Sequence, residues 1–307
     1  MTPPAQPILA TAEGLPRFTE HWLERVEWTH LDSAGELSRW RVCDAQAGRQ
    51  WLVVRVSAQA SPWELARLDR EYAIGPSLSP AWAVVPLARL GSAAGPLLVL
   101  DDDGGRPLSS LFDTPLPLEY FLRLAISATA ALAQAHRRGI VHGDIRPEHL
   151  MLGGNGEIRL TGLAFACRVD ELASKRPPLP EASLAYLPPE HQASPSADLY
   201  ALGVSFFQLL TGRLPFSAND PVQWLHQHVA VPAPDLAQWR SGLPAALNDL
   251  LAWLMAKQPA QRPDSATVLE AELHRCLNEW RELGNIRRST LPTQARSTRP
   301  LVGRGLE

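Results

Sequence analysis

Lysine is nearly absent from this chain of 307 residues. Of its 29 basic residues only Lys175 and Lys257 are lysines, so none occurs before residue 175. Every permanently positive side chain in the first half is therefore an arginine. The planar guanidinium of arginine is not a free substitute for the compact ammonium group of lysine, which restricts the kinds of phosphate site that this half can build.

Cysteine is scarce as well. Cys43, Cys167 and Cys276 are odd in number and far apart, and no Cys-x-x-Cys pair occurs. This pattern argues against both a disulfide framework and a zinc site, and it is typical of a protein from a reducing compartment.

Long apolar runs and a strong net charge are missing too. No run approaches the roughly 20 apolar residues that span a bilayer. The first residues, 1–14, lack the basic residues and the apolar core of a secretory signal. The net charge of −3 gives no general attraction to nucleic acid or to an anionic membrane. We therefore expect a cytoplasmic protein that binds neither.

The pattern of apolar residues changes along the chain. Segments rich in Val, Leu and Trp indicate short strands at 38–42, 51–56 and 96–100, with a helix predicted over 61–74. Later segments have apolar residues at helical spacing and predict helices at 118–138, 198–210, 247–255 and 265–282. The predicted fold class is α+β with two lobes, divided into a flexible leader (1–19), a small β-rich lobe (20–103), a larger helical lobe (104–282) and a linker or tail (283–307).

The segment Val141–His149 is the most informative part of the sequence. It reads Val-His-Gly-Asp-Ile-Arg-Pro-Glu-His and resembles the catalytic loop of protein kinases, His-Arg-Asp-x-Lys-x-x-Asn. In that comparison Asp144 stands at the position of the catalytic base. Arg146 replaces the lysine, and His149 replaces the asparagine that binds a magnesium ion.

Three further motifs follow in the order found in kinases. Leu187–Glu190 resembles the Ala-Pro-Glu that ends an activation segment, and Asp198–Gly203 resembles the start of the buried helix of the large lobe. Gln261–Pro263 contains the late arginine that pairs with that glutamate. The resemblance covers about residues 25–280. Leu209–Phe216, Asp220–Trp224 and the last predicted helix, with Cys276 and Trp280, resemble more closely the N-terminal kinase-like domain of bacterial multi-domain signalling proteins. In those proteins an NTPase domain follows, often opening with a phrase like Leu301–Glu307.

The resemblance implies a role for each matching residue. Asp144 and Arg146 are the candidate catalytic residues, and ATP is the implied cofactor. Arg55 stands where kinases place a phosphate-binding lysine, and Glu71 is its expected partner on the following helix. A structural role is expected of His142, Glu190, Asp198 and Arg262, whereas Arg55, Glu71, Leu100, Asp101, Asp103 and His149 are the candidate nucleotide-binding residues.

The phosphate-binding and metal-binding positions depart from the family pattern. Gly35 is the only glycine where a glycine-rich loop is expected, and Glu36 adds a repelling charge there. Gly162 falls at the position of the magnesium-binding aspartate, and His149 offers a nitrogen where magnesium prefers oxygen. Gly143 replaces the loop arginine, so no phosphate switch is expected at Ser174 or Ser183. No metal ligand is assigned, and use of magnesium is not expected.

Four functional interpretations stay open. The favoured one is a catalytically impaired pseudokinase that serves as a regulatory or interaction module, with a protein partner or with following NTPase or sensor domains. The second is an active, atypical serine/threonine kinase that depends on Asp144. The third is a small-molecule phosphotransferase, because His-Gly-Asp also resembles the loops of aminoglycoside and choline kinases. The fourth is a structural module without a nucleotide pocket.

Overall fold

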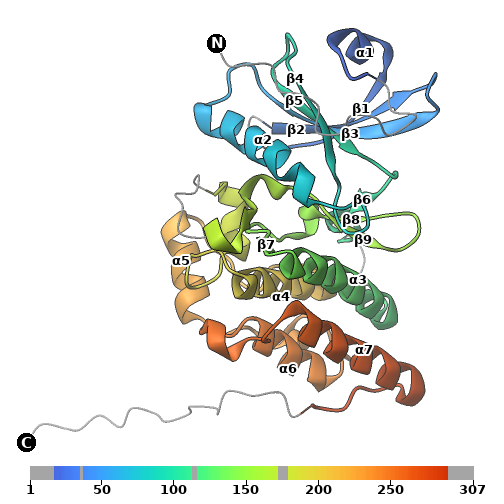
Figure 1. The fold of residues 1–307 in the computed structure, drawn as a ribbon. Helices are drawn as coiled ribbons and strands as arrows, with labels where there is room; N and C mark the ends of the chain where they lie inside the picture. The colour runs from blue at the N-terminus through green and yellow to red at the C-terminus, as the bar shows by residue number, and fades with distance from the viewer. Residues whose placement is uncertain (1–16, 35–36, 113–115, 172–178, 290–307) are drawn as a thin grey trace, which may run out of the picture.

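The computed structural model describes residues 17–34, 37–112, 116–171 and 179–289, and these residues form two lobes (Figure 1). The first lobe is an antiparallel sheet of five strands in the order β1-β2-β3-β5-β4. The predicted α+β class with a small β-rich lobe and a larger helical lobe is confirmed. The elements of the first lobe are α1 (Glu20–Arg25), β1 (Glu27–Ala34), β2 (Leu37–Asp44), β3 (Arg49–Val56), α2 (Pro62–Ile74), β4 (Pro86–Leu90) and β5 (Leu97–Asp101).

The second lobe is mainly helical. Two short sheets, β6-β8-β9 and β10-β7, lie at its junction with the first lobe (Figure 1). Its elements are β6 (Arg106–Pro107), α3 (Leu118–Arg137), β7 (Ile140–Val141), β8 (Leu150–Leu152), β9 (Ile158–Leu160), β10 (Cys167–Arg168), α4 (Pro195–Thr211), α5 (Pro221–Ala230), α6 (Ala245–Leu254) and α7 (Ala266–Leu283).

Both faces of the five-stranded sheet are covered. Side chains alternate between the faces of a strand, so Trp51 and Val53 of β3 face α1, whereas Leu52 and Val54 face α2. The indole Nε1 of Trp22 in α1 donates a hydrogen bond to Asp44 Oδ2 at 3.0 Å, which fastens α1 to the end of β2. The alternation decides which side chains of β3 can reach the junction of the lobes.

Local sequence signals explain where the site-bearing helices begin and end. Ser61 and Glu64 form a capping box at the start of α2, where each side chain hydrogen-bonds the other residue's backbone N–H. Ser194 caps α4 by accepting the N–H of Ala197, and Gly212 ends it with a positive φ of 71°. Most residues of α4 are buried, as its nearly all-apolar sequence predicts.

The predicted helices and strands are present with boundaries shifted by a few residues, but the helices α1 and α5 and the strands β1, β4 and β6–β10 were not predicted. Short helices and strands with few apolar residues give a weak periodic signal. The segment after the last predicted helix also differs from a simple linker, because Ile286 is buried in the core of the second lobe.

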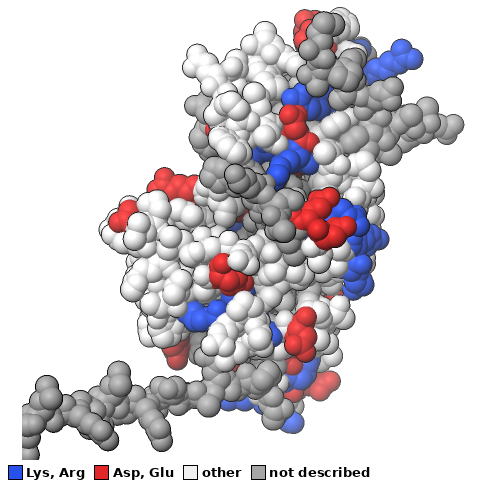
Figure 2. Space-filling view, turned by 60° about the vertical axis from the view of Figure 1, so that its left-hand side comes forward, with Lys and Arg blue, Asp and Glu red and all other residues white. Residues whose placement is uncertain are grey.

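The surface carries mixed charges. On the face drawn in Figure 2, acidic and basic side chains are interspersed among neutral ones and do not gather into a patch of one sign. Within the described residues, no helix has the length and apolar character needed to cross a bilayer.

Candidate functional site

Asp198 fixes the backbone of the loop that joins β7 and β8. At the N-terminal end of α4, its carboxylate accepts the backbone N–H groups of His142 and Gly143, each at 2.8 Å. His136 Nε2 lies 2.9 Å from the same carboxylate. Burial alone would raise the pKa of Asp198, but His136 and the backbone donor Gly143 lower it below its usual value, so the carboxylate stays ionised.

His142 connects this loop to the strand β9. Its Nε2 lies 2.9 Å from the carbonyl oxygen of Thr161, and its Nδ1 accepts the N–H of Asp144 at 3.2 Å. A carbonyl oxygen only accepts, so the ring proton is on Nε2. Burial lowers the pKa of His142, and the neutral ring connects the backbone of Asp144 with the backbone of Thr161.

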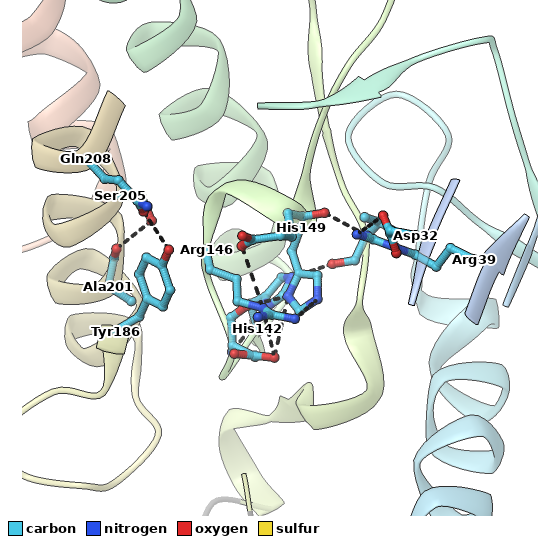
Figure 3. Close-up of polar contacts among 12 residues, drawn as sticks. Asp32, Arg39, His142, Arg146, His149, Tyr186, Ala201, Ser205 and Gln208 are labelled. Carbon is cyan, nitrogen blue, oxygen red and sulfur yellow. Dashed lines mark hydrogen bonds and ion pairs between the residues drawn. The ribbon is translucent and has the colours of Figure 1, made fainter. Parts of the chain in front are cut away.

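His149 is the second buried histidine of the loop. Its Nδ1 lies 2.8 Å from the carbonyl oxygen of Asp144 and must carry the proton. Its Nε2 is then the acceptor for the guanidinium of Arg146, 3.4 Å away (Figure 3). Burial, together with Arg146, lowers the pKa of His149 well below its usual value. The imidazole is therefore neutral and held on both sides.

Gly162 lies directly against the ring of His149. The backbone of Gly162 is left-handed, with φ of 69°, and a Cβ added there would overlap the imidazole atoms. The imidazole thus fills the space that any side chain at position 162 would need. The two departures from the kinase metal-binding pattern, His149 and Gly162, are coupled by packing.

The carboxylate groups near His149 and Gly162, which could offer oxygen ligands, lie beside the guanidinium group of Arg146. Asp144 Oδ2 lies 3.8 Å from Arg146 Nε and 3.5 Å from His149 Nδ1. Glu148 Oε2 lies 3.9 Å from the same Arg146 Nε. Within the described residues, no group of three or more His, Cys, Asp or Glu side chains is arranged to hold a metal ion.

Asp144 itself is buried, and burial raises the pKa of its carboxyl, with Arg146 acting in the opposite direction. Arg67 of α2, which the sequence analysis missed, also approaches it: its charge favours the ionised forms of both Asp144 and Glu71. The Arg67 guanidinium lies over the ring of Phe165, 4.9 Å from the ring centre. The helical spacing of four residues between Arg67 and Glu71 was the available signal.

The prediction that Arg55 forms an ion pair with Glu71 is wrong. The guanidinium of Arg55 lies over Trp40, 4.9 Å from its ring centre, and near Trp28 at 5.8 Å. Both aromatic residues pack against the α1 face of the sheet. Arg55 therefore points away from α2, and Val54 occupies the face of β3 that meets α2.

Glu71 has different partners. It is almost fully buried, and its Oε1 accepts the N–H of Leu163 at 3.2 Å. Burial raises the pKa of Glu71, although this backbone donor and Arg67 act in the opposite direction. Glu71 thus connects α2 to the residue that follows Gly162.

Two arginines of β2 reach the junction of the lobes instead of Arg55. Arg39 lies opposite Val54 in the sheet register. It binds both carboxylate oxygens of Asp32 at 2.7 Å and donates to the carbonyl oxygen of Glu148 at 2.9 Å (Figure 3). The second arginine, Arg41, forms an ion pair with buried Asp102.

The remaining residues predicted to bind nucleotide lie where β5 leaves the sheet. Leu100 is fully buried in the core beneath α2. Asp101 forms ion pairs with Arg49 at 3.0 Å and Arg159 at 3.4 Å, and Asp103 with Arg159 at 2.8 Å. These carboxylates are therefore engaged by arginines of the chain itself.

The scaffold ion pair expected in the second lobe is present. Arg262 donates to both carboxylate oxygens of Glu190, at 2.6 and 2.7 Å. It also donates to the carbonyl oxygens of Ala256 and Ser196 at 2.8 and 3.0 Å. The arginine side chain is fully buried, whereas that of Glu190 keeps 19% of its exposure.

Several predicted features lie outside the described residues. They are the leader at 1–16, Gly35 and Glu36 of the expected glycine-rich loop, Ser174, and the Leu301–Glu307 phrase.

A comparison with protein families bears on this arrangement. The family model described as protein kinase domain matches residues 112–273, which is more than half of the chain. The match includes the loop around Asp144, Gly162, Glu190, Asp198 and Arg262.

Curated relatives are similar over about half of the chain or slightly more. The probable serine/threonine-protein kinase pknA2 of Bifidobacterium longum is 31% identical over 50% of this chain and 21% of its own length. PrkC of Bacillus subtilis is 29% identical over 52% and 25%, respectively. PknL of Mycobacterium tuberculosis is 30% identical over 60% and 48%. The chain thus spans less than half the length of these relatives.

Proposed function

We propose, from the premise that this chain belongs to the protein kinase domain family, that it is a catalytically impaired kinase-fold module with a regulatory or interaction role. Its relatives carry the names of serine/threonine kinases. The proposal concerns what this chain's own site can do.

The observation that carries the proposal is the packing of His149 against Gly162. Magnesium binds oxygen ligands in near-octahedral geometry at about 2.0–2.1 Å. Here a neutral imidazole fills the space beside residue 162, and Arg146 lies beside the nearest carboxylates, Asp144 and Glu148. A metal ion would have to displace both a ring and a cation. The residues present do not fit magnesium.

ATP remains the cofactor that the family implies. Kinases stabilise the negative charge of the transferred phosphoryl group with a lysine and magnesium ions. In this chain the cations nearest the site are Arg39, Arg67 and Arg146. Arg39 is already paired with Asp32, so a nucleotide phosphate would have to compete with that carboxylate. We propose that any nucleotide binds without magnesium and without efficient transfer.

An active, atypical kinase is the second candidate, and one observation favours it. Asp144 Oδ2 is buried, and no hydrogen bond of ordinary geometry reaches it from the described residues. Arg146 and His149 hold this carboxylate oxygen at 3.8 and 3.5 Å, and a general base needs a carboxylate positioned to accept a substrate proton. This candidate requires the His149 ring to leave the position beside Gly162.

The domain organisation is proposed on the same grounds. The β-rich lobe at 20–103 and the helical lobe at 104–282 form the module, and its relatives extend well beyond the matched part. We propose that this module regulates, or is regulated by, a protein partner or an attached domain.

A phosphotransfer assay on the whole chain tests the proposal. With ATP, magnesium and general protein substrates, we expect a turnover of roughly 10⁻³ s⁻¹ or less, against about 1–100 s⁻¹ for ordinary kinases. Any residual activity should persist in Asp144→Asn, which identifies it as background. A turnover above about 1 s⁻¹ that Asp144→Asn abolishes would establish the active kinase instead.

A further inference from the structure

A bulge in the five-stranded sheet places Asp32 opposite Arg39. Strands β1 and β2 pair in regular register as far as His30 and Trp40, and the register then shifts by one residue so that Asp32 faces Arg39. Bulges re-aim side chains in this way. The Asp32 carboxylate accepts two hydrogen bonds from the guanidinium of Arg39, each 2.7 Å long (Figure 3). Charge-assisted pairs with this bidentate geometry are among the strong hydrogen bonds of proteins.

The face of the sheet that carries Arg39 is the one that meets the second lobe. Directly opposite residues of paired strands share a face. Arg39 lies opposite Val54, which belongs to the same apolar cluster as Met151 of the second lobe. The third guanidinium nitrogen, Nη1, donates to the carbonyl oxygen of Glu148 at 2.9 Å. One side chain therefore joins β1, β2 and the loop 142–149.

The charge of Arg39 acts on both sides of the junction between the lobes. Burial lowers the pKa of His149 and raises that of Glu71, and the positive charge of Arg39 adds a smaller contribution that lowers both. His149 belongs to the loop 142–149, whereas Glu71 belongs to α2. An anion that enters the junction between these elements would therefore meet the field of Arg39.

The two arginines on this face of β2 differ in the exposure of their partners. Arg41 is paired with Asp102, whose side chain is only 2% exposed, and it also donates to the carbonyl oxygen of Gly105. The side chain of Asp32, the partner of Arg39, is 40% exposed. An exposed carboxylate is hydrated again when its partner leaves, so the Arg39 pair costs much less free energy to open than the Arg41 pair.

We propose that Asp32, Arg39 and the carbonyl group of Glu148 form a latch that closes the junction of the lobes against phosphate ligands. The Asp32 carboxylate occupies the guanidinium that would otherwise bind a phosphate group, and the bond to Glu148 holds the first lobe to the loop. A ligand with linked phosphate groups opens the latch by taking the place of Asp32 on Arg39. The inference rests on the proposed function, since it concerns the same junction, and adds how that junction is regulated.

Calorimetric titration of the whole chain with ATP, in the absence of magnesium, tests the latch. Asp32→Asn keeps the shape of the side chain and removes its charge. The affinity for ATP should rise at least about fivefold, which corresponds to about 1 kcal/mol. Adenosine, which carries no phosphate group, should show no gain.

Three results of this titration would overturn the proposal. They are an affinity for ATP that is unchanged or weaker in Asp32→Asn, the absence of saturable ATP binding by this variant, and a gain for adenosine as large as the gain for ATP. The last result would mean that the substitution opens the junction without freeing a cation for phosphate.

A double variant assigns the gain to Arg39. When Arg39→Ala is added to Asp32→Asn, the gain in ATP affinity should disappear, because the released guanidinium is then absent. A gain that persists in the double variant would show that Asp32 acts only by repelling the phosphates, and the latch would be wrong. Urea unfolding of each variant shows whether it is folded under the conditions of the titration.

Asp69→Asn is the matched control. Asp69 of α2 pairs with Arg89 of β4 in the same lobe and is also partly exposed, so its substitution changes the net charge by the same amount. Its affinity for ATP should equal that of the unmodified chain. An equal gain in both variants would reduce the effect to net charge and contradict the latch. The phosphotransfer assay is a separate readout: a turnover typical of active kinases would contradict the proposed function, whereas only the ATP titrations decide the latch.

Discussion

The two ends of the loop 142–149 differ in how closely they match the kinase pattern. At the α4 end, Asp198 receives two backbone hydrogen bonds and His136, and deeper in the same lobe Arg262 and Glu190 form a doubly hydrogen-bonded pair. At the end that faces the first lobe, a neutral histidine packs on a glycine where kinases hold a metal ion. The scaffold contacts expected from the family are present, whereas His149 and Gly162 differ from the residues expected at the metal-binding positions.

This difference indicates that the fold and the chemistry are separable. Removal of one partner of a buried ion pair is strongly destabilising regardless of what the neighbouring site binds. The site has exchanged charged ligands for neutral packing and for ion pairs within the chain, such as Arg39 with Asp32.

The largest effect is expected from Glu190→Ala on the scaffold side. It leaves the fully buried guanidinium of Arg262 without its carboxylate, and breaking such a pair typically costs about 3–5 kcal/mol. Urea unfolding measures the loss. The partial exposure of Glu190 places the expected value at the lower end. A change below about 0.5 kcal/mol, the size typical of surface substitutions, would mean that the pair does not stabilise the lobe.

Acid should destabilise the scaffold through His228. Its side chain is fully buried, and burial, followed by the charge of Lys257, lowers its pKa from 6.5 to about 4. The unfolded chain therefore binds a proton that the folded chain does not, so stability falls as the pH drops from about 6.5 to about 4. At 1.4 kcal/mol per pH unit this loss is about 3 kcal/mol.

Urea unfolding as a function of pH measures that loss. His228→Phe should flatten the slope in this window, with a remainder from His142 and His149, whose pKa values burial also lowers. An unchanged slope in His228→Phe would contradict the assignment.

Gly162→Asp is the corresponding test of the metal side. The new side chain overlaps the His149 ring, and such overpacking typically costs about 1–3 kcal/mol. Addition of His149→Asn removes the ring and should recover the part of the loss that comes from the overlap, giving a coupling of about 1–2 kcal/mol in a double-mutant cycle of unfolding free energies, while the strain of a side chain at a φ of 69° remains. Strictly additive effects would show that the two positions are not packed together.

Arg39→Ala should have a smaller effect, of about 1 kcal/mol, because it removes a partly exposed ion pair and one hydrogen bond to the Glu148 carbonyl. The same change frees the junction of the lobes. We expect faster limited proteolysis between the lobes, measured against Arg89→Ala, which removes a different ion pair of the same sheet. Equal proteolysis of both variants would show that Arg39 does not connect the lobes.

The smallest effect is expected from Arg55→Ala. Loss of a cation–π contact at a partly exposed site costs about 0.5–1 kcal/mol. Because Arg55 faces away from α2, the affinity for ATP should not change. A fall in ATP affinity of tenfold or more would show that Arg55 binds the ATP phosphates.

The scaffold was readable from the sequence because its signals are local and strong. Asp198 opens an apolar helix with a capping serine before it, and Glu190 and Arg262 belong to short motifs with little alternative interpretation. The helices α2, α3, α4, α6 and α7 were predicted for the same reason: turn and cap residues and 3.6-residue periodicity are visible in the sequence itself.

The site was less predictable because its contacts join distant residues. Side chains alternate along β3, so Arg55 lies on the face of the sheet that packs against α1. An error of one residue along a strand is enough to predict the wrong face. Arg39 reaches Glu148 across 109 residues of sequence, which no periodic pattern reveals. The fit of the His149 ring onto Gly162 likewise requires coordinates, although both substitutions were apparent separately.

One measurement tests most directly whether the site around His149 and Gly162 binds magnesium together with ATP. The thermal stability of the whole chain is followed during ATP titration, with and without magnesium, and ligand at 100 times its Kd should add about 2.7 kcal/mol to the fold. The account predicts that magnesium adds nothing to whatever stabilisation ATP gives. A stabilisation by ATP that appears only with magnesium would show that the chain rebuilds a metal site despite His149 and Gly162, and would contradict the account.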